Sequence, residues 1–422
     1  MKSFGQLALI NVVSLSLMSL NLGCKSHQAP KPPSPTAVAS AHLPEVGGQK
    51  AIELRRLQSG TGVKPEFLSV TLFPGRGMNT FQITAFLPGK GEIPLLASPS
   101  LAEAQKVLNG GPEDMHGNKS FSFGGAFLFP FANRILGPVT LDRNTGAHYL
   151  EATWHGRTIR MVANWHGKQP GAPWVAMHGD ILAAKAANVE VRSEPDGSEA
   201  TAVYDLPAQG PWGEWFSSNR IKIHVQLARD TVTSTVTATN TGKEPEPISI
   251  GWHPYFHLPS GGRANARLHI PATERATVNN YDDVFPTGKL VPVDGTAYDF
   301  TAAEGAPLPD VLVDDSFVHL KRDPEGHAAA AIRDLGANYG MRLTAMTPRI
   351  REFQVYSPVD KAFIALEAQF NYTDPFGKEW PKDVDTGMVT LQPGESVTWE
   401  VQLQLFQPAS EMMGTPPHPP VQ

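Results

Sequence analysis

Alternating apolar and polar residues recur along this chain and restrict it to a fold built from half-buried β-strands. In residues 221–227, IKIHVQL, every second residue is apolar, and residues 397–406, VTWEVQLQLF, repeat the pattern. A two-residue period places apolar side chains on one face of a strand and polar ones on the other. Turn sequences such as TNTGK (239–243) and LQPGES (391–396) separate these segments, and helical periodicity is scarce. The pattern predicts a mainly β fold, an antiparallel β-sandwich or barrel.

A single segment, SLAEAQKVLNGG at residues 100–111, has the features of a helix. Ser100 and Glu103 form a possible capping box, and Asn109 followed by Gly110 supplies a stop signal. No internal repeat is evident, and no second linker divides residues 49–408. We therefore expect one large domain over these residues.

Charge and composition exclude some partners. The 422 residues are 41% hydrophobic, which is enough for a large core, and 35 Lys and Arg face 41 Asp and Glu, for a net charge of -6. An acidic chain has no general attraction for phosphate backbones or anionic lipids. We therefore expect no nucleic-acid partner, and membrane contact only through a possible N-terminal anchor.

The N-terminus has the character of an export signal. Lys2 precedes the apolar run LALINVVSLSLMSLNLG, which predicts a signal peptide over residues 1–23. Cys24 follows directly and is the only cysteine, which excludes an internal disulfide. The sequence LNLGC resembles a bacterial lipobox and so implies cleavage before Cys24 and lipidation of its sulfur. We expect a protein in the bacterial periplasm or anchored as a lipoprotein, with simple secretion or a retained anchor as alternatives.

Two segments rich in proline flank the predicted domain. Residues 24–48 are rich in Pro, Ala and Ser and lack apolar periodicity, which predicts an extended tether. Residues 409–422, with the sequence SEMMGTPPHPPVQ at their end, predict a disordered tail on the same grounds.

Four stretches combine reactive side chains with apolar flanks: FGGAFLFPFANRI (123–135), WVAMHGDIL (174–182), GWHPYFHL (251–258) and FIALEAQF (363–370). Glu367 either faces out of its strand by alternation or is buried, and burial without a partner costs several kcal/mol. His253 precedes Pro254, which lacks a ladder donor; we expect the strand to end there and to hold the imidazole at a sheet rim.

His–Gly pairs occur at His116, His155, His166 and His178. His155 and Gly156 lie between two alternating segments and predict a hairpin turn. Only His178 has apolar runs on both sides, so it is either a functional side chain or a hydrogen-bonded core histidine.

Taken together and in this order, the four stretches resemble the aldose 1-epimerase (galactose mutarotase) family, over most of residues 60–408. FPFANRI resembles the asparagine–arginine motif, MHGD the first histidine, HPYF the second histidine and ALEAQ the glutamate segment, while VDTGMVTLQPGES resembles the closing strand and turn. His257 and Ala368 replace a usual Asn and a frequent Pro. The separation of Arg134 and His178 is longer than usual, which predicts an inserted hairpin and leaves His166 as an alternative first histidine.

The resemblance implies a single-domain galactose mutarotase-like supersandwich that interconverts sugar anomers, without cofactor or metal, as a monomer acting on a small sugar. It implies that Glu367 is the base at the C1 hydroxyl and His253 the acid at the ring oxygen, with His178 polarising that side of the sugar. The implied substrate-binding residues are Asn133, Arg134, Tyr255, Gln354 and Asp314, with Asp315 as the alternative to Asp314.

Three other functions stay open at this point. A hexose-phosphate epimerase could hold phosphate with Arg349 and Arg351, although export argues against that substrate. A non-catalytic carbohydrate-binding lipoprotein would account for the departures at His257 and Ala368. A zinc site could be formed by His178, His253 and Glu367, although no closely spaced ligand pair supports it.

Overall fold

The computed structural model describes residues 43–59, 62–111, 113–194 and 196–408. All of these residues fall within one compact unit. The predicted signal peptide (1–23), Cys24, most of the predicted tether and the tail (409–422) lie outside the described residues. Export, lipidation and the tail therefore stay predictions.

The larger of two main sheets carries most of the side chains predicted to be functional. All its neighbouring strands are antiparallel. Its order is β24 (Pro286–Pro292), β23 (Ala272–Val278), β25 (Val313–Leu320), β28 (Glu352–Ser357), β29 (Phe363–Gln369), β21 (Gly251–His257), β7 (Gly125–Leu128), β5 (Asn79–Leu87), β4 (Glu66–Phe73) and β3 (Ile52–Arg55), with β6 (Gly91–Pro94) beside β5.

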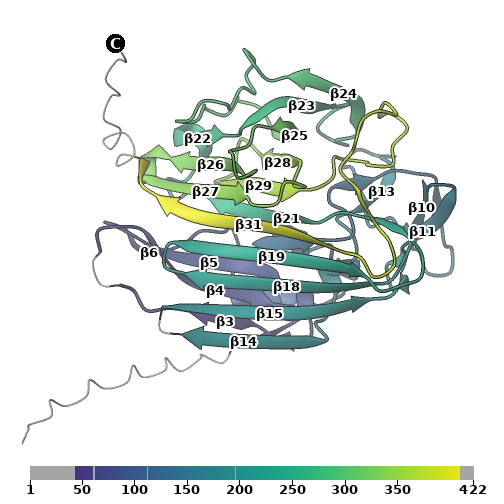
Figure 1. Ribbon diagram of the computed structural model, residues 1–422, viewed down its shortest axis with the longest axis horizontal. Coiled ribbons are helices and arrows are strands. Elements are labelled where there is room, and N and C mark those ends of the chain that lie inside the picture. The colour runs from purple at the N-terminus through teal and green to yellow at the C-terminus, as the bar shows by residue number, and fades with distance from the viewer. Residues whose placement is uncertain (1–42, 60–61, 112, 195, 409–422) are drawn as a thin grey trace, which may run out of the picture. The chain divides into compact units, whose positions relative to one another are not determined.

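The second sheet has eight strands and lies toward the viewer in Figure 1. Its order is β14 (Asn188–Glu194), β15 (Gly197–Leu206), β18 (Asn219–Ala228), β19 (Thr231–Asn240), β31 (Ser396–Phe406), β27 (Tyr339–Ala345), β26 (Ala328–Asp334) and β22 (Ala266–His269). Buried and exposed residues alternate along β18 and β19, as the two-residue period predicts.

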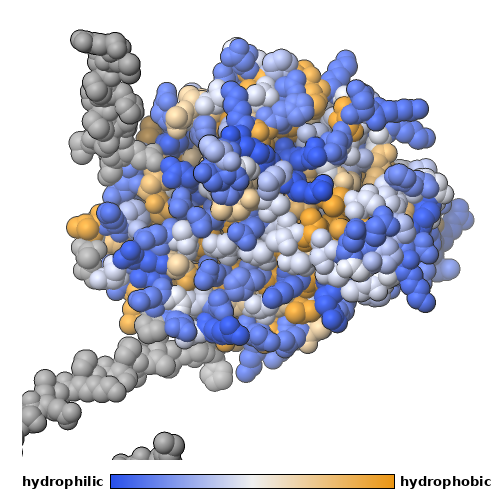
Figure 2. All heavy atoms as spheres, in the orientation of Figure 1, coloured by the Kyte–Doolittle hydropathy of each residue, from blue (hydrophilic) through white to orange (hydrophobic). Residues whose placement is uncertain are grey.

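The main core lies between these two sheets. One cluster of buried apolar side chains contains Val70 and Leu366 from the larger sheet and Ile223 and Leu403 from the eight-stranded sheet. Each sheet hides its apolar face against the other, because removal of apolar surface from water is the main favourable term in folding. The predicted mainly β, antiparallel sandwich is confirmed. The opposite face of the eight-stranded sheet is largely hydrophilic (Figure 2).

The long separation of Arg134 and His178 contains the predicted inserted hairpin. Strands β10 (His148–Trp154) and β11 (Arg157–Val162) are joined at His155 and Gly156, where the turn was predicted, and lie at one end of the view in Figure 1. A separate apolar cluster that includes Leu150 and Trp215 packs beneath them. The neighbouring strands are β9 (Val139–Leu141), β16 (Gln209–Gly210) and β17 (Gly213–Glu214) in the same sheet, and β8 (Arg134–Ile135), β13 (Trp174–Met177) and β12 (Trp165–His166) in a three-stranded one.

The predicted helix is α1, Leu101–Val107, and Ser100 Oγ accepts a hydrogen bond from the Glu103 amide at its N-terminus. Among the described residues, none of the helices combines the length and the apolar character that a membrane span needs. The short 3-10 helices are η1 (Pro74–Arg76), η2 (Met115–Gly117), η3 (Ser120–Ser122), η4 (Ile181–Ala183), η5 (Arg263–Asn265) and η6 (Leu335–Ala337).

The N-terminal limit of the fold differs from the predicted boundary at residue 49. β1 (Glu45–Val46) pairs with β2 (Gln49–Lys50), and Val46 is buried in a cluster with Phe73 and Phe81. The folded part therefore includes residues assigned to the tether. Isolated apolar residues in the stretch LPEVGG (43–48) show no periodicity, so this contact left no signal in the sequence.

The stability of the fold is expected to depend on pH through Glu246. This side chain lies in β20 (Glu246–Ile248), which pairs with β30 (Val389–Leu391), and it is fully buried. Asn219 Nδ2 donates to Glu246 Oε2 over 2.9 Å, while desolvation raises the pKa of Glu246 from 4.5 to about 8. The folded state therefore keeps a proton that the unfolded state has lost above its pKa, so this group's contribution to stability falls as pH rises from 4.5 to about 8.

We expect Glu246→Gln to remove that part of the pH dependence. At about 1.4 kcal/mol per pKa unit, the contribution amounts to up to roughly 5 kcal/mol across the interval. Urea unfolding followed by tryptophan fluorescence at pH 5, 6, 7 and 8 measures it. The exposed Glu190, changed to Gln, is the control and should keep the wild-type slope. Parallel pH profiles for wild type and Glu246→Gln would show that Glu246 ionises normally in the fold.

Candidate active site

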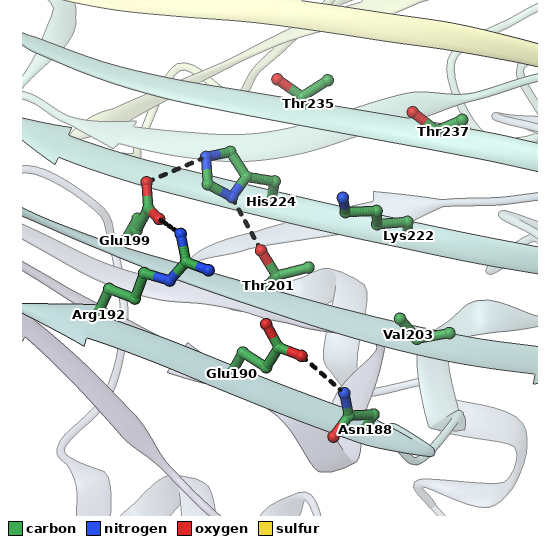
Figure 3. A pocket seen from close by; sticks show the side chains of 10 residues that line it. All are labelled: Asn188, Glu190, Arg192, Glu199, Thr201, Val203, Lys222, His224, Thr235 and Thr237. Atoms are coloured by element: carbon green, nitrogen blue, oxygen red, sulfur yellow. Dashed lines mark hydrogen bonds and ion pairs between the residues drawn. The ribbon is translucent and has the colours of Figure 1, made fainter.

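The outer face of the eight-stranded sheet is hollowed into a cavity of about 550 Å³, shown in Figure 3. Its polar side chains bond to one another: His224 Nδ1 lies 3.0 Å from Thr201 Oγ1, and Arg192 Nη1 lies 3.5 Å from Glu199 Oε1. None of the side chains predicted to be functional lines this cavity.

A cleft of about 270 Å³ brings together all eight residues predicted to act on or bind a sugar: Glu367, His253, His178, Asn133, Arg134, Tyr255, Asp314 and Gln354. Their positions in the sequence span residues 133–367, so the cleft exists only in the folded chain. The strands β25, β28, β29 and β21 are neighbours in the larger sheet and supply five of them.

Alternation along β21 explains how the cleft and the core share one strand. His253 and Tyr255 point into the cleft, whereas Trp252 and Phe256 belong to the main core. Trp252 Nε1 donates to the Gly125 carbonyl over 2.9 Å, which fixes the strand against β7. A rigid strand holds the imidazole in one place.

The expectation that the strand ends at Pro254 is wrong. β21 continues to His257, and Pro254 pairs with Gly125 of β7. On the β29 side, paired residues occur at Gly251 and from Tyr255 onward, with none between them. Proline lacks a donor, so it is tolerated where one edge of the strand needs no ladder bond, and the interruption lies next to His253.

Glu367 and His253 form a buried pair. His253 Nε2 lies 3.2 Å from Glu367 Oε1, and Gln369 Nε2 donates to Glu367 Oε2 over 2.6 Å. Desolvation raises the pKa of Glu367 well above its usual range, with Asp314 and Glu352 acting in the same direction. Desolvation also lowers the pKa of His253 to about 3. Burial thus favours the uncharged form of each partner.

His178 presents a hydrogen-bond donor to the cleft. The Asn133 amide donates to His178 Nδ1 over 3.2 Å, and the His178 amide donates to the Asn133 carbonyl over 2.9 Å. Burial lowers the pKa of His178 well below 6.5, followed in effect by His253 and Arg134. A neutral imidazole that accepts at Nδ1 carries its hydrogen on Nε2. The His178 and His253 rings meet edge to face, with centroids 5.1 Å apart.

The alternative first histidine, His166, is exposed on β12 and does not line the cleft. The two candidate aspartates, Asp314 and Asp315, also differ in whether they line the cleft. Asp314 lines the cleft and accepts from Gln354 Nε2 over 2.7 Å, while desolvation raises its pKa to about 6. Asp315 instead bonds to Arg275 and to the Tyr281 hydroxyl. Geometry therefore favours His178 and Asp314.

Arg134 is buried and held in a fixed orientation. Its Nη1 donates to Asn133 Oδ1 over 2.7 Å, and its guanidinium carbon lies 5.0 Å from the centroid of the Trp165 ring. A planar guanidinium in this position offers several donors to sugar hydroxyls.

Sequence reasoning missed several side chains that line the cleft: Phe121, Trp165, Lys168, Tyr281, Asp282 and Tyr356. Most lie in loops or at strand ends, where no periodicity marks them. Trp165 had one usable signal, because it directly precedes His166, which was already under consideration.

The two departures from the family pattern lie outside the cleft lining. Ala368 is in the main core, and its carbonyl accepts from Trp399 Nε1 over 3.1 Å. His257 lies at the end of β21 and does not line the cleft.

The proposed phosphate site of a hexose-phosphate epimerase gains no support, because Arg351 pairs with Asp385 at 2.7 Å and neither Arg351 nor Arg349 lines the cleft. Within the described ranges, no group of three or more His, Cys, Asp or Glu side chains has a geometry that could hold a metal ion.

Solved structures share this fold. A galactose mutarotase-like protein from Clostridium acetobutylicum superposes with a TM-score of 0.61 at 19% identity, covering 81% of this chain and 93% of that one. The GalM/aldose epimerase homologue of C. elegans gives a TM-score of 0.60 at 16% identity, covering 85% of this chain and 98% of its own. The galactose mutarotase-like supersandwich predicted from the sequence is thus confirmed.

Sequence comparison agrees. The chain is 27% identical over 290 residues to the uncharacterized protein YphB of Escherichia coli K12, covering 66% of this chain and 82% of that protein. The model of the aldose 1-epimerase family matches residues 96–404, a range that includes every residue lining the cleft. This chain therefore belongs to the aldose 1-epimerase family.

Proposed function

We propose that this protein is a mutarotase, which interconverts the α and β anomers of a hexose or related sugar by opening and closing the ring. The observation that carries the proposal is the buried pair of Glu367 and His253, 3.2 Å apart, in a cleft that also contains His178 and Arg134. Membership of the aldose 1-epimerase family supports an isomerase acting on a small sugar.

Ring opening needs a base at the C1 hydroxyl and an acid at the ring oxygen. Glu367 takes the hydroxyl proton, and the electrons of that O–H bond form the C1 carbonyl. The bond between C1 and the ring oxygen breaks with its electron pair on the oxygen, which takes a proton from His253 Nε2. Rotation about the C1–C2 bond and the reverse transfers then close the other anomer.

The bound sugar would prepare the pair for these transfers. In the protein alone, burial favours a protonated carboxyl beside a neutral imidazole. Hydroxyls that donate to a carboxylate stabilise its charged form. Sugar binding therefore shifts the proton from Glu367 toward His253, which creates the base and the acid together.

The other side chains would hold the sugar. The Nε2–H of His178 donates to the oxygens near C1, and Arg134 and Asn133 donate to hydroxyls on the other side of the ring. Asp314, Gln354 and Tyr255 add an acceptor, an amide and a hydroxyl. A non-catalytic binder gains no support from His257 or Ala368, because neither lines the cleft.

We further propose that the protein acts outside the cytoplasm, as a monomer, in the periplasm or anchored through a lipid on Cys24. The support for export and for the lipid anchor is the apolar run that ends at the lipobox-like LNLGC. This part of the proposal is independent of the chemistry in the cleft.

Polarimetry tests the proposed activity. Freshly dissolved α-glucose and α-galactose change rotation spontaneously, and the purified protein should shorten that relaxation in proportion to its concentration for at least one sugar. Relaxation times equal to those in buffer for every sugar tried, with binding detected by calorimetry, would leave a sugar-binding protein in place of an enzyme.

A further inference from the structure

Beside the cleft of the candidate active site lies another cavity, of about 410 Å³, which is distinct from the one on the outer face of the eight-stranded sheet. We call it the second cavity. Its lining comes mainly from residues 145–148 at the start of β10, from residues 162–166 between the end of β11 and β12, and from Trp174 of β13, with a contribution from the loop at residues 113–119. All of these except the loop at 113–119 belong to the part of the chain that lengthens the separation of Arg134 and His178. The insertion therefore builds a cavity as well as a hairpin.

The cleft and the second cavity meet at one side chain, because Trp165 lines both. Arg134 lies over its ring on the cleft side, at 5.0 Å. Neither Glu367 nor His253 lines the second cavity. A sugar with C1 at the reacting pair thus has the second cavity beyond the Arg134 side of the cleft.

The chemistry of the second cavity suits carbohydrate. Trp174 and His148 stack with ring centroids 4.0 Å apart and planes at 11°, and His166 lies 4.4 Å from Trp174. Flat rings contact the apolar faces of sugars. The Lys119 ammonium can donate to hydroxyls, and the side-chain oxygens of Asn118 and Asn164 can accept from them.

The cavity is also held in shape before any ligand binds. Asn164 Nδ2 donates to Asn118 Oδ1 over 2.9 Å, and Asn164 Oδ1 accepts from the Met177 amide over 2.7 Å. Trp174 packs on the apolar cluster beneath the hairpin. A preformed cavity loses little conformational entropy on binding.

We propose that this second cavity is a subsite for the sugar units that follow the reducing end of an oligosaccharide, whose terminal ring occupies the cleft. The preferred substrate is then a reducing oligosaccharide of two or more hexose units. The inference rests on the proposed mutarotase function for the position of the terminal ring.

The test compares kcat/KM for anomer interconversion of glucose with that of maltose, cellobiose, maltotriose and cellotriose, by polarimetry or NMR. The wild type should favour at least one oligosaccharide over glucose by about threefold to tenfold, the range expected for one or two ring contacts. Trp174→Ala, and Ala147→Trp, which fills the cavity from its rim, should bring that ratio close to one.

Trp154→Ala is the matched control, because Trp154 packs on the same apolar cluster but lines neither cavity. It should retain the wild-type ratio. Equal kcat/KM for glucose and all four oligosaccharides in the wild type, or an unchanged ratio in both cavity variants, would overturn the subsite.

Failure of the proposed function is a separate result. If no sugar is interconverted, calorimetry with the same oligosaccharides decides the subsite. Binding of a trisaccharide that is stronger than that of glucose and is lost in Ala147→Trp would support the subsite without the enzyme. Equal or absent binding would overturn both.

Discussion

Glu367→Gln is expected to lower kcat for anomer interconversion by about 10²- to 10⁴-fold, the range typical for loss of a general base. The amide is nearly the same shape as the carboxyl and can still accept from Gln369 Nε2, which now bonds to Glu367 Oε2 over 2.6 Å. It cannot take a proton from the C1 hydroxyl. Polarimetric kcat and KM for the best sugar measure the effect.

The fold should tolerate this change. Burial already raises the pKa of Glu367, so a neutral amide removes a group whose charged form the cleft disfavours. Glu246→Gln is the matched control, because it makes the same substitution at another buried carboxyl outside the cleft. It should leave kcat within about twofold of wild type. A Glu367→Gln protein with wild-type kcat would remove the carboxylate from the mechanism.

His253→Asn should lower kcat over the same range, about 10²- to 10⁴-fold, with a smaller change in KM. Asparagine keeps a polar group at the position but cannot transfer a proton to the ring oxygen. Because burial lowers the pKa of His253 to about 3, the free enzyme should show no loss of kcat/KM between pH 5 and 8 that is due to this imidazole. Polarimetry across that pH range measures both the fall in kcat and the pH dependence of kcat/KM.

His257→Asn is the control for His253→Asn. It makes the same substitution four residues along β21, at a side chain that does not line the cleft. It also restores the residue usual in the family, so kcat should change little. Comparable losses in the two variants would mean that the strand as a whole, and not the His253 imidazole, controls the activity.

The sequence predicted the sandwich well, because a two-residue period has a direct geometric meaning. Every second residue of a half-buried strand must be apolar, and both IKIHVQL and VTWEVQLQLF lie within strands of the eight-stranded sheet. The order of the sheets carries no such local signal. Pairs such as Gln354 and Glu367 are opposite each other only because of the pairing of β28 and β29.

The eight side chains predicted for the cleft do line it, but through the family resemblance more than through local pattern. Local sequence marked three of them: Glu367 as a carboxylate in an apolar run, His253 as an imidazole beside Pro254, and His178 as the one His–Gly histidine between two apolar runs. Tyr281 and Tyr356 were missed because an aromatic at a loop or strand end is equally consistent with core packing. The strand through Pro254 was mispredicted because the sequence does not show which edge of β21 needs a donor.

The inserted hairpin has its own apolar cluster, separate from the core that holds β21, β28 and β29 in place. Substitutions in β10 or β11 therefore alter packing that the reacting pair does not share. For the proposed mutarotase, such an arrangement would let the choice of sugar chain change during evolution while the reacting pair keeps its own packing. Relatives with a shorter or different hairpin would then differ in the length of the carbohydrate they accept, and not in the reaction they perform.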